Sequence, residues 1–142
     1  MIQIREIDHV VLRVSKLDEM IEFYCDVLGC RLEKDQSNIG LTQLRAGACL
    51  VDLVAVDSEL GRLGGSAPGS QARNLDHVCF RIAPFDDVLI SEHLEKHGID
   101  RGEIESRYGA EGYGPSIYVN DPEGNTVELK GPPSFHSDEA AS

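Results

Sequence analysis

Hydrophobic and polar positions change period along this chain in an order that occurs twice. Residues 9–14, HVVLRV, are apolar and β-branched, which predicts a strand. Apolar residues then recur at a spacing close to 3.6 in SKLDEMIEFYCDVLG, which predicts an amphipathic helix capped by Ser15 or Asp18 and ended by Gly29. The next runs, CRLEKDQ, LTQLRA and CLVDLVAV, predict three strands separated by turn residues.

The same order restarts after residues 57–74, a stretch rich in Gly, Ser and Pro that we expect to be a linker or mobile loop. The octapeptide LDHVCFRI at 75–82 nearly repeats IDHVVLRV at 7–14, 68 residues earlier. A helix is predicted in APFDDVLISEHLEKHG, followed by strands at about 100–107, at PSIYVN and at TVELKG. The tail, 132–142, is polar and expected to be flexible.

The pattern therefore predicts an α+β fold in which two tandem βαβββ modules, residues 4–56 and 75–131, make one domain of 142 residues. Each half is too small to bury its sheet face well, so pairing of the halves would complete a core or cavity. We also expect a homodimer, because edge pairing or module swapping would cover exposed strands.

The net charge and the cysteine content limit the classes of binding partner and the cellular compartment that we expect for this protein. The net charge is −12, with 25 acidic against 13 basic residues, so nucleic acid and anionic membranes are not expected partners. The first residues contain no basic stretch leading into an apolar one, and the four cysteines form no CxxC pair. We therefore expect buried, reduced thiols and a cytoplasmic location.

The repeated strand and the closing strand of each half bring candidate metal ligands to one face. Residues two apart on a strand share a face. In each copy of the repeated strand, the face turned away from the predicted helix carries a histidine, His9 in the first copy and His77 in the second. The closing strands, in CLVDLVAV and TVELKG, hold Asp52 and Glu128 at matching places. An acid in such an apolar strand is costly unless it is paired or coordinated. Two imidazoles and two carboxylates suit one divalent Ni, Zn, Co, Mn or Fe ion.

Other interpretations of these residues remain open at this point. A single strand histidine is more often a hydrogen-bonded core residue than a ligand, and it is the repetition that favours ligation. Asp52 is one methylene shorter than glutamate, and its strand has one extra residue after the preceding glycine. His93 and His97, four apart on the second helix, could form a metal pair, although we expect both to be exposed.

The motifs DHVVLRVSKLDEMIEFYCDVLG, LDHVCFRI and GPSIYVNDPEGNTVEL resemble the vicinal oxygen chelate superfamily over about residues 4–131. That superfamily includes glyoxalase I, extradiol ring-cleaving dioxygenases and the bleomycin and fosfomycin resistance proteins, and the closing segment is most similar to small lactoylglutathione-lyase-like proteins. The resemblance implies a glyoxalase/dioxygenase-like fold with a metal-containing cleft. It also implies metal ligation by His9, Asp52, His77 and Glu128, with Asp52 standing where glyoxalase I has a glutamate.

The function implied by the resemblance is a metal-dependent lyase or isomerase of glyoxalase I type. Its substrate would be a small oxygen-chelating molecule, such as the hemithioacetal of a 2-oxoaldehyde and a thiol. Glu128 would carry the proton between carbons and Asp52 would take a second acid/base role. Arg13 and Arg81 lie in phase with the histidines, and they would either anchor a substrate carboxylate or pair with acids at the sheet rim.

Two alternative functions differ in what they require of the chain. A ferrous ring-cleaving dioxygenase needs two histidines and one carboxylate, and the fourth candidate ligand, Asp52, counts against it. A resistance protein that binds a metabolite or antibiotic needs an aromatic-lined groove, and the chain has no Trp, four Tyr and four Phe. The lyase is therefore the leading hypothesis.

Overall fold

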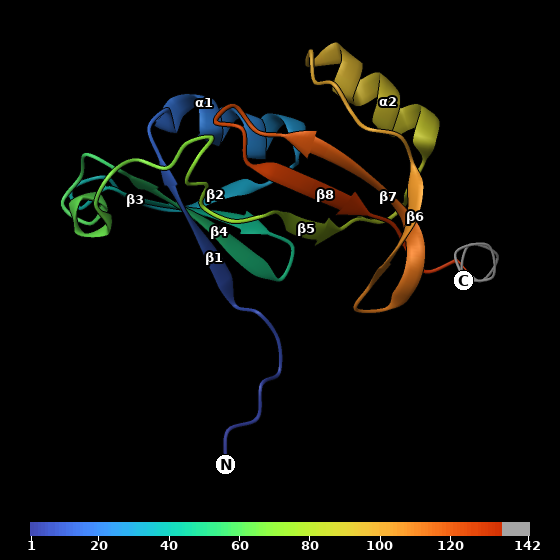
Figure 1. Ribbon diagram of the computed structural model, residues 1–142, viewed down its shortest axis with the longest axis horizontal. Coiled ribbons are helices and arrows are strands. Elements are labelled where there is room, and N and C mark those ends of the chain that lie inside the picture. Colours follow the sequence, from blue (N-terminus) through green and yellow to red (C-terminus); the bar gives the residue numbers. More distant parts are fainter. Residues whose placement is uncertain (135–142) are drawn as a thin grey trace. The chain divides into compact units, whose positions relative to one another are not determined.

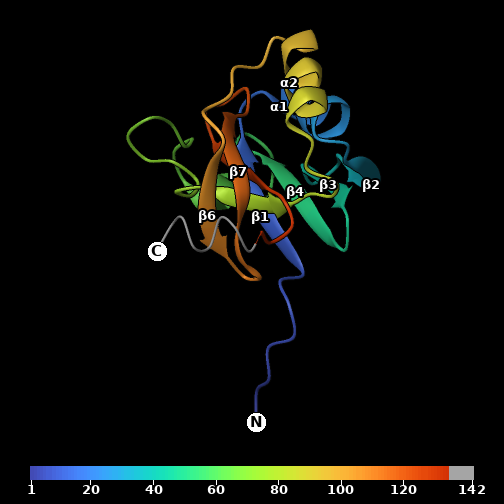
Figure 2. The ribbon, with the colours of Figure 1, turned by 90° about the vertical axis from the view of Figure 1, so that its right-hand side faces the viewer.

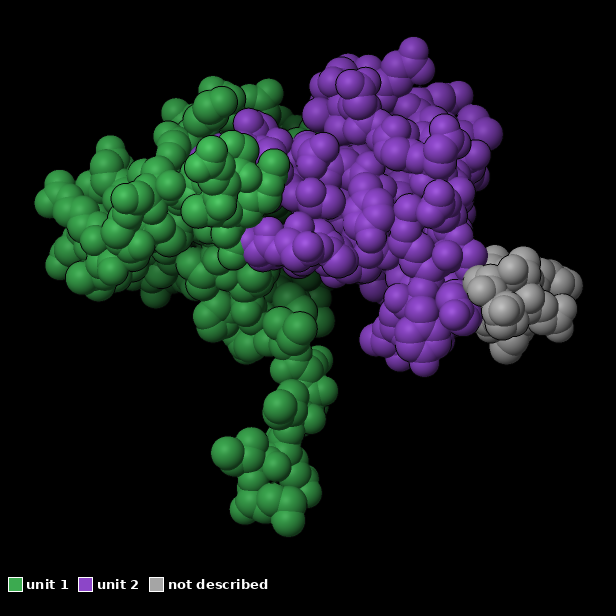
Figure 3. Space-filling model, viewed as in Figure 1, with its two compact units in different colours: residues 1–74 green, residues 75–142 purple. Residues whose placement is uncertain are grey.

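The computed structural model describes residues 1–134, and the chain divides into two compact units, Met1–Asn74 and Leu75–Ser142 (Figure 3). The predicted tail therefore lies mostly outside the described residues. Each unit is one four-stranded mixed sheet with a helix beside it (Figures 1 and 2). The predicted α+β fold with two βαβββ modules is confirmed.

The two sheets have the same strand order and the same directions. The first sheet contains, in spatial order, β1 (His9–Val14), β4 (Cys49–Ala55), β3 (Leu41–Ala46) and β2 (Arg31–Gln36). The second contains β5 (Val78–Arg81), β8 (Thr126–Lys130), β7 (Gly112–Asn120) and β6 (Glu105–Gly109). In both, the first strand runs parallel to the last, and the other pairs are antiparallel. Equivalent positions in the two units can therefore be identified from the ladders.

The first unit buries one face of its sheet beneath the first helix. This helix, α1 (Leu17–Glu22), continues as a π-helical segment, η1 (Phe23–Val27), and the chain turns at Gly29, whose φ of 81° favours glycine. Buried side chains on the helical segment and the sheet form the core: Met20, Phe23, Tyr24, Leu12, Val14, Leu44, Val51 and Leu53. The predicted caps were wrong, because the capping position is Lys16 and Asp18 lies inside the first turn.

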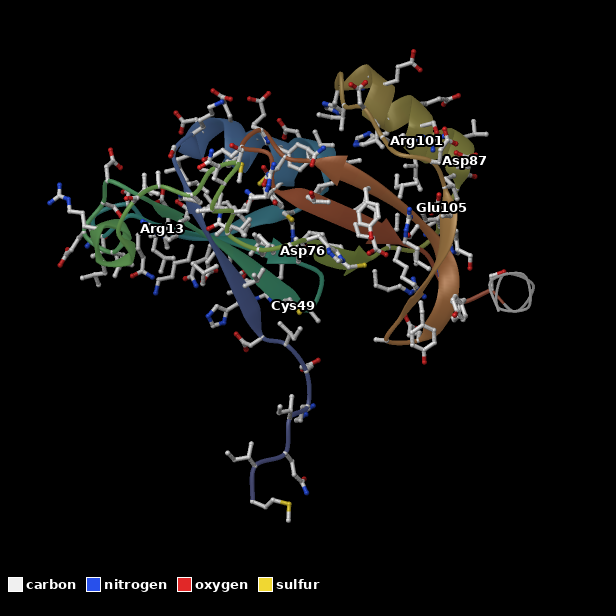
Figure 4. All side chains as sticks on the ribbon, in the orientation of Figure 1. Arg13, Cys49, Asp76, Asp87, Arg101 and Glu105 are labelled. Carbon is white, nitrogen blue, oxygen red and sulfur yellow. The ribbon has the colours of Figure 1, made fainter. Side chains whose placement is uncertain are left out.

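The second unit places its helix, α2 (Asp87–Lys96), one residue after a carboxylate that caps it: Asp86 accepts a hydrogen bond from the Leu89 amide at 3.0 Å. The strand expected at about 100–107 begins only at Glu105. Residues before it make other bonds, since Arg101 pairs with Asp87 at 3.3 Å and the Gly102 amide donates to Tyr118 (Figure 4). The strand instead continues to Gly109, where a tight turn leads directly into β7.

The segment between the modules is partly ordered by the first strand. It contains a short 3-10 helix, η2 (Gly61–Gly64), and the Arg13 guanidinium donates to the carbonyls of Gly61, Gly65 and Ser66 at 3.0, 2.7 and 2.9 Å. These bonds tie residues 61–66 of the segment to β1, and a role of the whole segment as a linker or mobile loop stays a prediction. Among residues 1–134, no helix is long and apolar enough to cross a bilayer.

Candidate functional site

The two predicted acids occupy the same ladder position in their sheets. Each acid lies opposite one residue on the parallel strand and one on the antiparallel strand: Val11 and Gln43 around Asp52, Cys79 and Tyr118 around Glu128. Both carboxylates are buried, with 3% of Asp52 and 6% of Glu128 exposed. The extra residue in the first half therefore falls in the turn and does not move Asp52 out of phase.

In the second unit, a histidine and the acid lie close together. The Nε2 atom of His77 is 3.3 Å from Oε1 of Glu128. The other ring nitrogen, Nδ1, is 2.7 Å from Oδ1 of Asp76, the preceding residue, which Figure 4 labels near the start of β5. In the tautomer that donates from Nδ1 to Asp76, Nε2 is an acceptor on the Glu128 side and could bind a cation together with the carboxylate.

In the first unit, His9 has the same local bond: its Nδ1 is 2.7 Å from Oδ1 of Asp8. This hydrogen bond, together with the negative charge of Asp52, raises the pKa of His9. The Asp52 carboxylate accepts from the Gln43 side-chain amide, whose nitrogen is 3.3 Å from each oxygen. A carboxylate on the second ring nitrogen is typical of metal-binding histidines.

The sequence reasoning missed these two supporting carboxylates, Asp8 and Asp76, although their signal was present. Both copies of the octapeptide contain the dipeptide Asp-His. In both units the aspartate carboxylate is hydrogen-bonded to the imidazole of the histidine that follows it. A repeated Asp-His at the start of a strand is therefore a sequence feature from which a supported histidine can be predicted.

Further residues that sequence reasoning missed surround Glu128. The Tyr118 ring packs edge-on against the His77 ring, with centroids 5.6 Å apart. The guanidinium carbon of Arg107 lies over the Tyr118 ring, 4.4 Å from its centroid. Burial, followed by the nearby Glu128 charge, raises the pKa of Tyr118, and the same causes raise the pKa of the Cys79 thiol to about 11. Both groups therefore stay protonated at neutral pH and present hydrogen-bond donors to the carboxylate.

The two predicted substrate-binding arginines make bonds within their own units. Arg13 holds the segment after β4, as described above. Arg81 pairs through Nε with Glu111 at 2.6 Å and donates to the Ile82 carbonyl at 2.6 Å. The pairing of Arg81 is the rim arrangement considered as the alternative, and anchoring of a substrate by either arginine stays a prediction.

Each unit brings one histidine and one acid that suit a transition-metal ion, which is the donor chemistry expected from the sequence. Within residues 1–134, three or more His, Cys, Asp or Glu side chains are nowhere gathered closely enough to hold an ion. The helix histidines, His93 and His97, are exposed as expected, with their rings 4.8 Å apart. The four-ligand centre and the cleft therefore stay predictions.

Residues 6–129 match the family model described as the glyoxalase/bleomycin resistance protein/dioxygenase superfamily. A virulence protein of Salmonella typhimurium, STM3117, is 36% identical over 129 residues, which cover 89% of this chain and 83% of that protein. The glyoxalase domain-containing protein RDO1 of Mycosarcoma maydis is 33% identical over 132 residues, covering 90% and 69%.

Solved structures share the same architecture. The crystal structure of the Salmonella typhimurium virulence protein superposes with a TM-score of 0.73 and 28% identity, covering 92% of this chain and 98% of that one. A lactoylglutathione lyase from Agrobacterium tumefaciens superposes with a TM-score of 0.61 over 89% and 92% of the chains. At 22% identity, this second likeness shows the fold alone.

Proposed function

The chain belongs to the glyoxalase/bleomycin resistance protein/dioxygenase superfamily, and on that premise we propose that it is a metal-dependent lyase or isomerase of glyoxalase I type. Its substrate is a small molecule with two neighbouring oxygens, such as the hemithioacetal of a 2-oxoaldehyde and a thiol. The observation that carries the proposal is the repetition of one supported histidine and one buried acid at matching places in both units.

The proposed ligands of one divalent ion are His9, Asp52, His77 and Glu128. These four side chains suit a metal ion by the type of their donor atoms and by the hydrogen bonds of the two imidazoles. Each histidine has its Nδ1 bonded to a neighbouring carboxylate and can offer Nε2 to a metal. Imidazole and carboxylate donors suit Ni, Zn, Co, Mn or Fe. The proposal holds whether the two halves of one chain supply the ligands or two chains share them.

The bound ion would act as a Lewis acid on the substrate oxygens and make the neighbouring C–H more acidic. Glu128 takes that proton and returns it to the adjacent carbon. Its surroundings suit the task, since His77 Nε2 is 3.3 Å away and the raised pKa of Tyr118 keeps a protonated phenol beside the carboxylate. Asp52, held by the Gln43 amide, is the second acid.

The experiment is metal analysis of protein purified without chelator, followed by activity assays. We expect about one transition-metal ion per chain, and loss of that ion in His77→Ala. His97→Ala is the matched control, because this exposed histidine at the end of α2 should leave metal content unchanged. Methylglyoxal is then assayed with several thiols, and a catechol with ferrous iron and dioxygen tests the ring-cleaving alternative. A chain that neither retains nor rebinds a transition ion would refute the proposal.

We further propose that the protein is a homodimer. The outer strands β2 and β6 expose large apolar side chains, with 57% of Leu32 and 73% of Tyr108 accessible. Pairing with a second copy would cover such edges. Sedimentation at micromolar concentration should give the mass of two chains, and a monomer would contradict this proposal without affecting the metal site.

A further inference from the structure

We infer that Lys130 binds an anionic group of the substrate, a carboxylate or a phosphate, on the face of the second sheet that carries Glu128. This inference deepens the proposed function and rests on it for the identity of the reacting site. Lys130 stands two residues after Glu128 on β8, so both side chains lie on the same face of the strand.

The first observation is a buried ammonium with few partners. Only 5% of Lys130 is exposed, and its Nζ donates one hydrogen bond, to the Gly112 carbonyl at 2.9 Å. No carboxylate among residues 1–134 forms an ion pair with it, and Glu111, the residue before Gly112 in the chain, pairs with Arg81. A buried ammonium has three donors and is costly without a negative partner, which indicates that an anion supplies the missing charge.

The second observation is that two glycines keep the place that this side chain occupies. A Cβ at Gly114 would lie 3.1 Å from Nζ, and one at Gly109 would lie 3.1 Å from Cε. The side chain therefore crosses β7 and β6 over two residues that have no side chain. Ser116, its antiparallel partner on the same face, is fully buried and carries a hydroxyl that bonds to Arg107 at 2.6 Å. Glycine at positions 109 and 114 thus lets the fold hold a lysine at this buried place, with the Ser116 hydroxyl on the same face.

The third observation comes from the first unit. The ladders make Val54 the equivalent of Lys130, since Val54 pairs with Leu41 and Arg13 as Lys130 pairs with Ser116 and Arg81. Val54 is buried and apolar, so the backbone plan itself does not require a cation at this place. The cation therefore belongs to the chemistry of the second unit.

The placement also limits the substrate. Residues two apart on a strand are separated by about 6.6 Å, and the Lys130 side chain extends toward Gly112, away from Glu128. The anionic group must therefore lie several bonds from the carbon that loses its proton. A thiol adduct whose thiol part carries a carboxylate meets this requirement, whereas an adduct of an uncharged thiol does not.

The test is binding of propionate and of inorganic phosphate to the purified chain, followed by NMR titration of backbone amides, with propionamide as the neutral probe. We expect saturable shifts around β7 and β8 with at least one anion and none with propionamide. Lys130→Met should weaken binding on the order of 10- to 100-fold, the size of a lost charged hydrogen bond. Arg101→Met, which removes a cation paired with Asp87 near α2, should change affinity less than about twofold.

Thermal unfolding of the same samples separates ligand binding from a structural role. If Lys130 serves the anion, replacing this buried charge by an apolar side chain should leave the melting temperature unchanged or raise it. If Lys130→Met fails to fold, Lys130→Gln, which keeps a donor but no charge, should lose anion binding in its place. Unchanged affinity in the folded variant, or no saturable binding by the parent chain, overturns the inference. Metal content measured on these samples tests the proposed function separately, because anion binding through Lys130 needs no metal.

Discussion

Asp52 and Glu128 have the same ladder position in the two units, but their neighbours differ. Asp52 is held by an amide, with the Gln43 nitrogen 3.3 Å from both of its oxygens. Glu128 instead faces the His77 ring at 3.3 Å and lies opposite Tyr118, whose pKa is raised. The same backbone plan thus surrounds one acid with an amide donor and the other with an imidazole and a phenol. The difference favours a ligand role for Asp52 and a base role for Glu128.

The largest expected difference between the units is in catalysis. Glu128→Gln keeps the shape but removes the proton acceptor, so turnover should fall by a factor on the order of 10² to 10⁴. Asp52→Asn should act mainly through metal affinity, and excess metal should largely restore turnover. Turnover of both variants is measured at saturating metal. If Asp52→Asn stays inactive while Glu128→Gln recovers, the base has been assigned to the wrong unit.

The next comparison concerns the cores. Leu53 and Leu129 directly follow the two acids on the opposite face, and 0% and 6% of their surfaces are exposed. Replacement of either by alanine leaves a cavity, so each should lower the free energy of unfolding by about 2–5 kcal/mol. Urea unfolding measures both values. A loss below about 1 kcal/mol for one variant would show that its unit does not pack as tightly as the other.

The supporting carboxylates allow a smaller and more symmetrical test. Asp8→Asn and Asp76→Asn weaken the acceptor that orients each imidazole, so each should lower metal affinity about 10- to 100-fold. Competition with a chromogenic chelator measures this affinity. Asp26→Asn is the control, because this exposed carboxylate lies on η1 and should have no effect. Equal effects would make the histidines equivalent, whereas an effect at one site only would make one histidine the weaker ligand.

The smallest expected difference is at the helix starts. Asp86→Ala removes the hydrogen bond to the Leu89 amide and should cost about 1 kcal/mol of stability. Its counterpart 68 residues earlier, Asp18, lies inside the first turn of α1, where a carboxylate contributes only through the helix dipole. Asp18→Ala should therefore cost about 0.3–1 kcal/mol. Chemical unfolding resolves the two values, and equal losses would mean that the Asp86 bond adds nothing beyond charge.

Local pattern was enough to predict most elements of the fold. Apolar and polar residues alternate along a strand that buries one face, and apolar residues recur about every 3.6 positions along an amphipathic helix. These two spacings predicted β1, α1 and β2 to β4, and the corresponding elements of the second unit. The duplicated octapeptide identified the two modules and both histidines. The prediction was less accurate at residues 100–104, where the Gly102 amide bonds to the distant Tyr118 carbonyl, and at the start of α1, which has no side-chain cap. The spacing of apolar residues carries no information about either feature.

The sequence by itself determined the two-module α+β plan, the family and the histidine–acid pair of each half. Tertiary structure alone decided what surrounds those pairs. Asp52 matches Glu128 because backbone hydrogen bonds set register, whatever the number of turn residues. Tyr118 and Lys130 share the face of Glu128 because the pairing of β7 and β8 places all three side chains there. Arg13 serves a segment 48 to 53 residues later in the chain, and only folding brings those carbonyls to its guanidinium.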